Sequence, residues 1–284
     1  MYEIKSLFLP FNTSRPTTGV VGSSCLIASE HNSYIEGAYY HQTMPLIAGE
    51  GITLPGDYLL YFEQEALREC ELSESFFRAL VSRFELPFKA TSSSSTSGYA
   101  DWRDMTSFSP NNIGEYARIF DLSLIERSVD DHASHWRAVA ENLILDSGRP
   151  VMVVGSQVPN SIGKRVVIAW NGSVESVRAL IASRPFLEKC EELVILQVEG
   201  GMVPGPNAME IAKSLEMLGI NGKVESIDSS GLSVGRSVLT FAEEYGCDLL
   251  IKGAFTQSRL RQMLFGGPTT QILEEAPMPV LFCN

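Results

Sequence analysis

Short apolar runs alternate along the chain with segments whose apolar residues recur at helical spacing, and the pattern is clearest in the second half. The runs occupy 164–170, 193–198, 223–227, 248–252 and 279–283. Runs of this length between turn residues are typical of buried strands. Strictly alternating strands and helices, with strands that are apolar throughout, predict an α/β fold built on a parallel, doubly wound sheet.

The helices between these strands are delimited by capping residues. Asn171-Gly172-Ser173 is a turn whose last residue caps the first helix, and Asn207 with Glu210 forms a capping box on the second. Gly219 and Gly246 end helices, because glycine accepts the left-handed conformation found there. The apolar residues at helical spacing are Val174, Val177, Leu180 and Ile181 in the first helix, and Ala208, Ile211, Ala212, Leu215 and Leu218 in the second.

The first half repeats this order in a less regular form. Residues 143–151 align with 272–280, and residues 121–125 align with 248–252. Toward the N-terminus the pattern predicts two strands and a long helix, at 4–10, 34–40 and 58–86. The apolar positions on the buried side of that helix are Leu59, Phe62, Ala66, Phe76, Phe77 and Leu80.

Two tandem domains of the same fold are therefore expected, 1–157 and 161–284, each with a parallel five-stranded sheet and joined by a linker at 157–163. The segments 151–154 and 280–283 are short, apolar strands without charged residues, and such edges promote aggregation when they are left exposed. We expect the two domains to pack through these edges about a pseudo-two-fold axis.

Composition narrows the class of protein. A hydrophobic content of 44% with 20% charged residues is typical of a soluble globular chain. No apolar run approaches the roughly 20 residues that span a bilayer, and the first residues lack the basic region and cleavage site of a secretion signal. The five cysteines show no C-x-x-C spacing, which predicts reduced thiols in the cytoplasm. The net charge of −12 argues against nucleic acid as a partner, because phosphate binding needs an excess of Lys and Arg.

The loop after the fourth strand of the second domain carries the candidate chemistry. It runs from Gly253 to Thr270 and has glycines at both ends, which let backbone N–H groups approach an anion closely. The second pair of glycines opens onto a helix N-terminus, where negative charge is favoured. Ligands of doubly wound sheets bind beyond the carboxyl ends of the strands, so this loop and the turn at 171–173 are expected at the same place.

This loop and the residues after it resemble the universal stress protein family, whose members carry the pattern G-x2-G-x9-G-(S/T) around the phosphates of ATP. Gly253 and Gly266 match the pattern, whereas Thr256 replaces its second glycine and Gly267 replaces its hydroxyl residue. Asn171 stands at the position of the family's nucleotide-binding Asp, and it can still form hydrogen bonds but carries no charge.

The resemblance implies that the second domain binds ATP or another adenine nucleotide, and it implies no metal site. The base or ribose is then expected near Asn171 and the phosphates near the glycine loop. The implied site residues are Asn171, Gly253, Arg259, Gly266, Gly267, Thr269 and Thr270. Arg259 and Arg261 remain open between two interpretations, as charge-assisted donors to phosphates or as solvated residues of a helix surface.

The corresponding loop of the first domain has the opposite character. Residues 126–131 contain no glycine and three carboxylates, which would repel an anion and block its approach to the backbone. The first domain is therefore expected not to bind phosphates. The serine-rich segment 91–98 is expected to form a loop between the third and fourth strands of this domain.

Two other kinds of site have weaker support. His132 and His135 follow Asp130-Asp131 at a spacing that a metal site could use, but no further ligand clusters with them, and an acidic first helical turn explains the pattern. A serine nucleophile of the G-x-S-x-G type is absent from the sequence. Gly22-Ser23-Ser24 and Gly172-Ser173 are interpreted as turn and capping residues.

Three hypotheses follow for the function. The leading one is a stress-response or regulatory protein without enzymatic activity, whose ligand is an adenine nucleotide. Its expected assembly is a pseudo-dimer within the chain or a homodimer. The second is the same scaffold without nucleotide binding, acting as a dimerising interaction module. The third is a nucleotide-hydrolysing or adenylate-transferring enzyme, which would need a loop such as S-G-G-x-D-S that the sequence lacks. The sequence identifies no protein partner.

Overall fold

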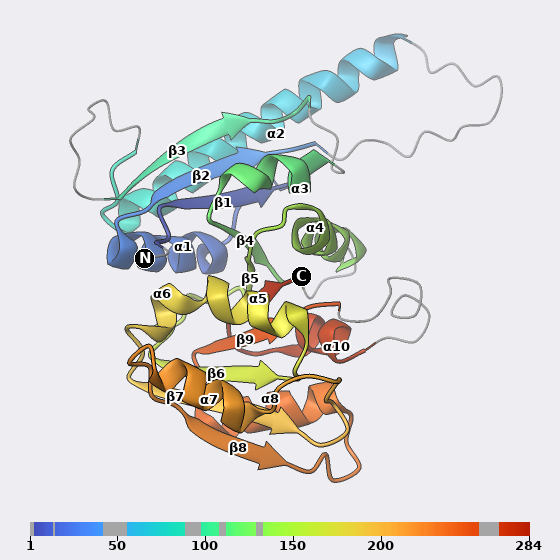
Figure 1. Cartoon of the computed structure of the whole chain (residues 1–284). Helices are drawn as coiled ribbons and strands as arrows, with labels where there is room; N and C mark the ends of the chain where they lie inside the picture. Colours follow the sequence, from blue (N-terminus) through green and yellow to red (C-terminus); the bar gives the residue numbers. More distant parts are fainter. Residues whose placement is uncertain are drawn as a thin grey trace, which may run out of the picture.

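The computed structural model describes residues 3–13, 15–41, 56–88, 98–107, 112–128, 133–255 and 267–284. Strands and helices alternate along this part of the chain in both halves (Figure 1). The strands are β1 (Ser6–Phe11), β2 (Tyr34–Tyr39), β3 (Tyr99–Asp104), β4 (Leu122–Glu126), β5 (Val151–Val154), β6 (Arg165–Trp170), β7 (Glu192–Val198), β8 (Lys223–Ile227), β9 (Leu249–Gly253) and β10 (Val280–Cys283). The helices are α1 (Thr18–His31), α2 (Gly56–Arg83), α3 (Ile113–Tyr116), α4 (Ala133–Asp146), α5 (Val174–Ala182), α6 (Arg184–Leu187), α7 (Ala208–Glu216), α8 (Val234–Tyr245) and α10 (Pro268–Glu275).

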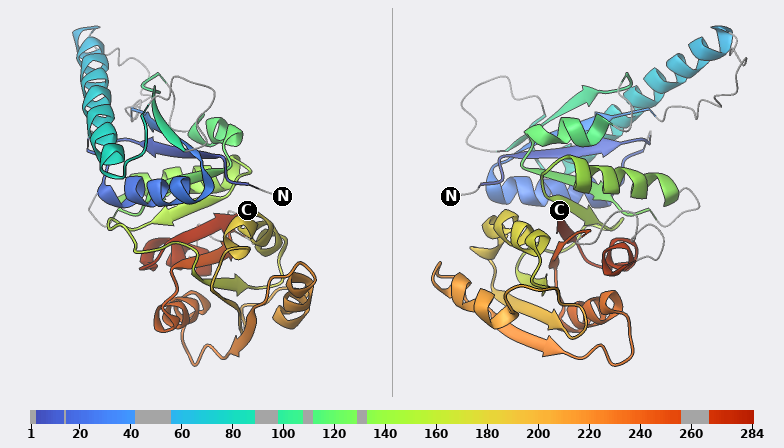
Figure 2. Two further views of the ribbon diagram at one scale, coloured as in Figure 1. Left: turned by 90° about the vertical axis from the view of Figure 1, so that its left-hand side faces the viewer. Right: turned by 45° about the vertical axis from the view of Figure 1, so that its right-hand side comes forward.

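These strands form one sheet in the order β3-β2-β1-β4-β5-β10-β9-β6-β7-β8. The order β3-β2-β1-β4-β5 of the first half is matched by β8-β7-β6-β9-β10 in the second, and neighbouring strands within each half are parallel. Helices lie on both faces of the sheet (Figure 2). The predicted α/β fold with two parallel five-stranded halves is confirmed.

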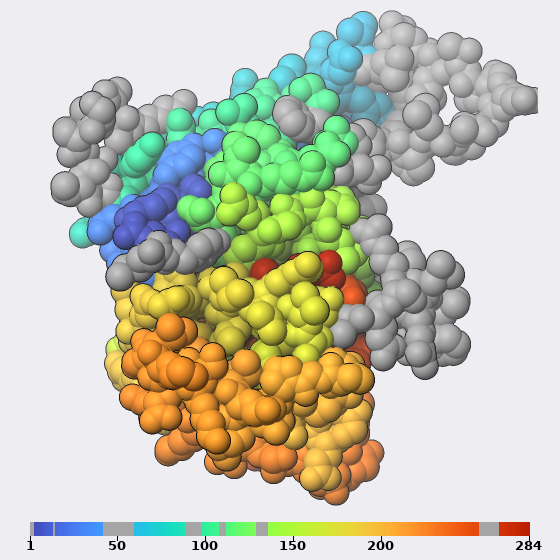
Figure 3. Space-filling view, viewed as in Figure 1, coloured from blue at the N-terminus to red at the C-terminus, as the bar shows by residue number. Residues whose placement is uncertain are grey.

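The two halves meet where β5 pairs with β10, and this pairing is antiparallel. Met152 lies opposite Leu281 at its centre, and every residue of both strands is buried. Because the two strands hold the same position in their halves, an antiparallel pair relates the halves by an approximate two-fold rotation. Figure 3 shows the halves in contact along this joint, with the C-terminal residues in red between them. The predicted packing through 151–154 and 280–283 is confirmed.

Two apolar layers hold the helices against the sheet. One layer includes residues of α1, α2, α5 and α7 (Val20, Phe77, Ala179 and Leu215). The other includes residues of α3, α4, α8 and α10 (Ile113, Val139, Val238 and Ile272). Both layers run through both halves of the molecule, so burial of apolar surface stabilises the joint as well as each half.

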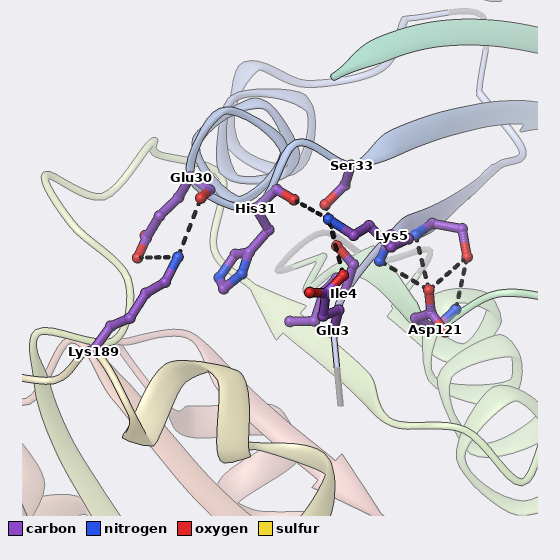
Figure 4. Close-up of polar contacts among 9 residues, drawn as sticks. Glu3, Ile4, Lys5, Glu30, His31, Ser33, Asp121 and Lys189 are labelled. Carbon is purple, nitrogen blue, oxygen red and sulfur yellow. Dashed lines mark hydrogen bonds and ion pairs between the residues drawn. The ribbon is translucent and has the colours of Figure 1, made fainter. Parts of the chain in front are cut away.

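The internal repeat extends to two aspartates that hold the starts of the central strands. Asp121 Oδ2 accepts hydrogen bonds from the backbone N–H groups of Lys5 and Ser6, at 2.9 and 3.0 Å (Figure 4). In the second half Asp248 Oδ1 accepts a hydrogen bond from the backbone N–H of Arg165 at 2.9 Å. Each aspartate precedes the fourth strand of its half and binds the start of the first, in agreement with the predicted alignment of 121–125 with 248–252.

A polar contact also joins the halves beside the sheet. Lys189 Nζ donates to the carbonyl oxygen of Glu30 at 3.1 Å and lies 3.4 Å from Glu30 Oε1 (Figure 4). The ring of His31 packs edge-on against Phe186, with 5.5 Å between the ring centroids. The end of α1 and the segment after α6 are therefore in contact in addition to the sheet joint.

Helix α5 buries only part of the face that its apolar pattern predicts, since Val177 and Leu180 pack against the core and the other two residues do not. Val174 and Ile181 are 61% and 59% exposed, whereas Ser176 and Ala179 are buried. The first turn of α5 lies directly against the backbone of Gly253, so only a small side chain fits at that contact.

Three other local expectations are corrected. Phe76 is exposed, because Phe77 takes the inward position on α2. Gly22-Ser23-Ser24 lies inside α1 and not in a turn, and Gly22 lets that helix approach Val158 closely. The segment 91–98 precedes the third strand and does not follow it. That strand, β3, escaped prediction because it is the polar, half-buried edge of the sheet.

The five cysteines are all free thiols, and Cys190 is the one that is not fully buried. In the described segments no helix combines the length and the apolar character that crossing a membrane requires.

Candidate functional site

Three segments of the second half meet at the carboxyl ends of β6 and β9. They are the turn 171–173 after β6, the residues that end and follow β9, and the start of α10. A cavity of about 40 Å³ lies among them. It is lined by Ala169, Trp170, Asn171, Leu196, Val198, Gly201, Val234, Val238, Lys252 and Pro268. This is the end of a doubly wound sheet at which ligands bind.

Asn171 uses its side-chain oxygen within the chain. Oδ1 accepts hydrogen bonds from the backbone N–H of Ser173, at 3.2 Å, and from the hydroxyl of Ser176. The carbonyl of Asn171 accepts a hydrogen bond from Val203 N at 2.9 Å, and this fixes the turn against the loop after β7. The amide hydrogens of Asn171 form no hydrogen bond within the described residues, so they are the donors that this side chain can offer a ligand.

Gly253 is required where β9 approaches helix α5. A Cβ atom at this position would lie 2.4 Å from Ser176 N and 2.6 Å from the carbonyl carbon of Glu175. No real Cβ contact is that short, so any side chain would displace the first turn of α5. The close backbone approach that the sequence predicts at Gly253 is therefore an approach to a helix.

The start of α10 offers backbone N–H groups to the same region. Gly267 is the N-cap in an extended conformation, without a side-chain cap, and Pro268 follows it. A Cβ atom on Gly267 would meet no described residue within 4 Å. Thr269 is buried, and its Oγ1 accepts a hydrogen bond from Phe255 N at 3.4 Å. An uncapped helix start of this kind favours an anion.

Phe255 begins the loop in a strained conformation. Its φ angle is +59°, in the left-handed region that side chains other than glycine rarely adopt. Such strain persists where the surrounding structure holds it, and it is concentrated at ligand-binding and switch segments.

Comparison with known proteins agrees with this geometry. A model of the Universal stress protein family matches residues 187–284. This part of the chain is a universal stress protein domain. The resemblance seen in the loop pattern is therefore confirmed for the second half.

Solved structures extend the likeness in fold to the first half. The universal stress protein from Archaeoglobus fulgidus DSM 4304 has 16% identity and a TM-score of 0.72, and the alignment covers 99% of this chain and 97% of that one. A putative universal stress protein from Pseudomonas aeruginosa UCBPP-PA14 has 13% identity and a TM-score of 0.52, with 99% and 93% coverage. No curated protein sequence matches the chain.

The first half has a different arrangement at the equivalent place. Glu126 lies opposite Val154 of β5, as Gly253 lies opposite Cys283 of β10. The carboxylate of Glu126 lies beside the backbone N–H of Val20, in the first turn of α1, and its Oε2 is buried without a hydrogen-bond partner among the described residues. Burial raises the pKa of Glu126 to about 7, and the backbone N–H of Val20 opposes that shift. A carboxylate of the chain itself thus stands at the position that glycine holds in the second half.

Lys252 belongs to the site, although the sequence analysis did not include it. It is 8% exposed, it lines the cavity, and its Nζ donates to the carbonyl oxygen of Gly253 at 3.1 Å. Burial lowers the pKa of Lys252 to about 8, and the charge of Glu175 opposes that shift. A lysine within the otherwise apolar run 249–253 was the available signal.

Several predicted residues lie outside the described residues. They are Thr256, Arg259, Arg261 and Gly266 of the loop, and their roles stay predictions. His132 and the side chain of His135 also lie outside, so the metal hypothesis at that position is untested. Among the side chains that the structure does describe, no group of three or more His, Cys, Asp or Glu could hold a metal ion.

Proposed function

We propose that the universal stress protein domain binds an adenine nucleotide at the cavity between β6, β9, α8 and α10, and that the chain is a cytoplasmic regulatory protein without catalytic activity. The observation that carries this proposal is the location of the cavity at the carboxyl ends of β6 and β9, between the Asn171 turn and the uncapped start of α10. Nucleotides bind at this end of such sheets, with their phosphates at a helix N-terminus.

The polar groups around the cavity support the same ligand class. Asn171 offers amide hydrogens, and the first turn of α10 offers the backbone N–H groups of Thr269 and Thr270. The lining is otherwise largely apolar, as in most small-molecule sites. A base or ribose near Asn171 and phosphates near Gly267 would match these two kinds of surface.

We further propose that the domains are 1–157 and 161–284 and that the first does not bind phosphates. The support is Glu126, whose carboxylate stands at the position equivalent to Gly253 and lies beside the first turn of α1. A second negative charge beside it would be repelled.

Two substitutions at Gly267 test the nucleotide proposal. Both place a good helix N-cap where a Cβ atom meets no described residue within 4 Å, so both should preserve α10. Gly267→Ser restores the hydroxyl of the family pattern and should tighten ATP and AMP binding roughly 2- to 10-fold in titration calorimetry. Gly267→Asp places a carboxylate beside the phosphates and should weaken binding by about 10-fold or more.

The first half provides the matched control. Asp130→Asn and Asp131→Asn should leave nucleotide affinity unchanged, because their loop belongs to the domain that we propose to be inactive. Absence of heat with wild-type protein at millimolar ATP and AMP would reject the proposal and favour the dimerising interaction module.

A further inference from the structure

We propose that Lys252 is the cationic contact of the site, and that its ammonium group binds a phosphate oxygen of the ligand. The inference rests on the proposed function and specifies it, because it makes the site selective for phosphorylated ligands over neutral nucleosides. Lys252 lies in β9 between Ala169 of β6 and Phe282 of β10, and it lines the cavity together with Asn171 and Pro268.

The charge of Lys252 is not neutralised by the described part of the chain. Its only hydrogen-bond acceptor there is the carbonyl oxygen of Gly253, and it forms no ion pair in that part. Glu175, in the first turn of α5, acts on it only as a more distant charge. Burying an ammonium group without a counter-ion is costly, and buried charges are normally paired.

The neighbouring loop cannot supply the missing negative charge. Residues 256–266 contain no Asp and no Glu, whereas they contain Arg259 and Arg261. The start of α10, next to Pro268, adds a further positive potential through the helix dipole. Neither the described residues nor the loop 256–266 places a carboxylate in contact with Lys252, and an anionic ligand is what this combination of groups binds.

The size and lining of the cavity indicate which part of a ligand reaches Lys252. Its volume of about 40 Å³ leaves room for a small polar group beside Lys252. A phosphate oxygen fits such a space and accepts a charge-assisted hydrogen bond from an ammonium group. The base and ribose would then lie outside it, toward Asn171 and the loop.

Lys252→Met tests the assignment, because methionine has a similar length and no charge. The variant should fold, since it replaces a buried lone cation with an apolar group. We expect AMP and ATP affinity to fall by at least about 10-fold and adenosine affinity to stay within about 2-fold of wild type. Lys213→Met, on the exposed face of α7, removes the same charge away from the cavity and should bind like wild type.

A second measurement uses the wild-type protein and separates free phosphate from nucleotide. NMR of the side-chain carbons follows the pKa of Lys252, and the Lys252→Met or Lys252→Arg variant assigns the signals. This pKa should rise when AMP or inorganic phosphate is added, because a bound anion favours the charged form. Adenosine should not raise it.

The outcomes distinguish this inference from the proposed function. Equal AMP affinity of wild type and Lys252→Met overturns the Lys252 assignment and leaves nucleotide binding in place. If wild type binds neither ATP nor AMP, the proposed function fails. The inorganic phosphate titration alone then decides whether Lys252 belongs to an anion site. A rise of the Lys252 pKa then upholds an anion site, and an unchanged pKa overturns it. If Lys252→Met does not fold, the inorganic phosphate titration of the wild-type protein is the deciding test in the same way.

Discussion

Arg127 of the first half donates from Nε to the carbonyl oxygen of Leu273 in helix α10 of the second half, 2.6 Å away. Its Nη1 also donates to the carbonyl of Ala276, just after the helix ends. A cation suits this end of a helix, where carbonyl groups lack intrahelical partners. Helix α10 thus has its C-terminus bound by the first half and its N-terminus next to the candidate nucleotide cavity.

Arg127→Met should destabilise the protein by about 2–4 kcal/mol, because it leaves two buried carbonyl groups without donors. Urea unfolding measures this effect. Arg178→Met, at an exposed position of α5, should change stability by less than about 0.5 kcal/mol. Equal effects of the two substitutions would show that the contact between the halves contributes little.

Glu126→Gln should change the pH dependence of stability. Burial raises the folded-state pKa of Glu126 from its ordinary 4.5 to about 7, so the folded state holds a proton that the unfolded state releases. Wild-type stability contributed by this group is therefore present below pH 4.5 and is lost as the pH rises toward 7. The amide does not ionise, so the variant should exceed wild type by about 1–2 kcal/mol at pH 8 and lose most of that advantage at pH 5.

Unfolding at the two pH values checks this prediction, with Glu244→Gln on the exposed face of α8 as the control. The control should show the same difference from wild type at both pH values. A Glu126→Gln variant that behaves like the control would indicate that this carboxyl group ionises in the folded state as it does in the unfolded chain.

Asp248→Asn should weaken the start of the second half. The carboxylate accepts hydrogen bonds from Ser161 Oγ and from the backbone N–H groups of Gly163, Lys164 and Arg165. An amide keeps one acceptor atom and directs N–H groups at these donors, so we expect a loss of about 1–3 kcal/mol in thermal or urea unfolding. Asp121→Asn should give a similar loss, and a neutral result at both positions would contradict the structural equivalence of the two aspartates.

Gly253→Ala should cost about 1–3 kcal/mol, because the added methyl group meets the backbone of α5 at Ser176. The matched control is Gly155→Ala, where a Cβ atom meets nothing within 4 Å. Thermal unfolding of both variants compares the same chemical change in crowded and open surroundings. If Gly253→Ala lost nucleotide affinity with no loss of stability, the glycine would be needed for the ligand and not for helix packing.

Local features were predictable from the sequence because they depend on near neighbours along the chain. The capping box of Asn207 and Glu210 and the left-handed Gly246 were confirmed, since a cap needs only a side chain within the same turn and a C-terminal glycine only its own backbone freedom. The pairing of β5 with β10 was predictable as well, because short apolar edges must be covered. Their register, with Met152 opposite Leu281, needed the structure.

Contacts between distant segments decided the rest. The apolar spacing of α5 placed Val174, Val177, Leu180 and Ile181 inside, but only Val177 and Leu180 pack against the core, and the small Ser176 lies against the backbone of Gly253. A lysine within the apolar run 249–253 was a visible signal, but the sequence alone could not show its cost, because that cost depends on the elements that pack around Lys252 and exclude water. The sequence by itself determined the order of the elements, their caps and the family of the second half. The tertiary structure decided which faces are buried and which charge lies at the cavity, because burial depends on which segments pack together and not on the residue type alone.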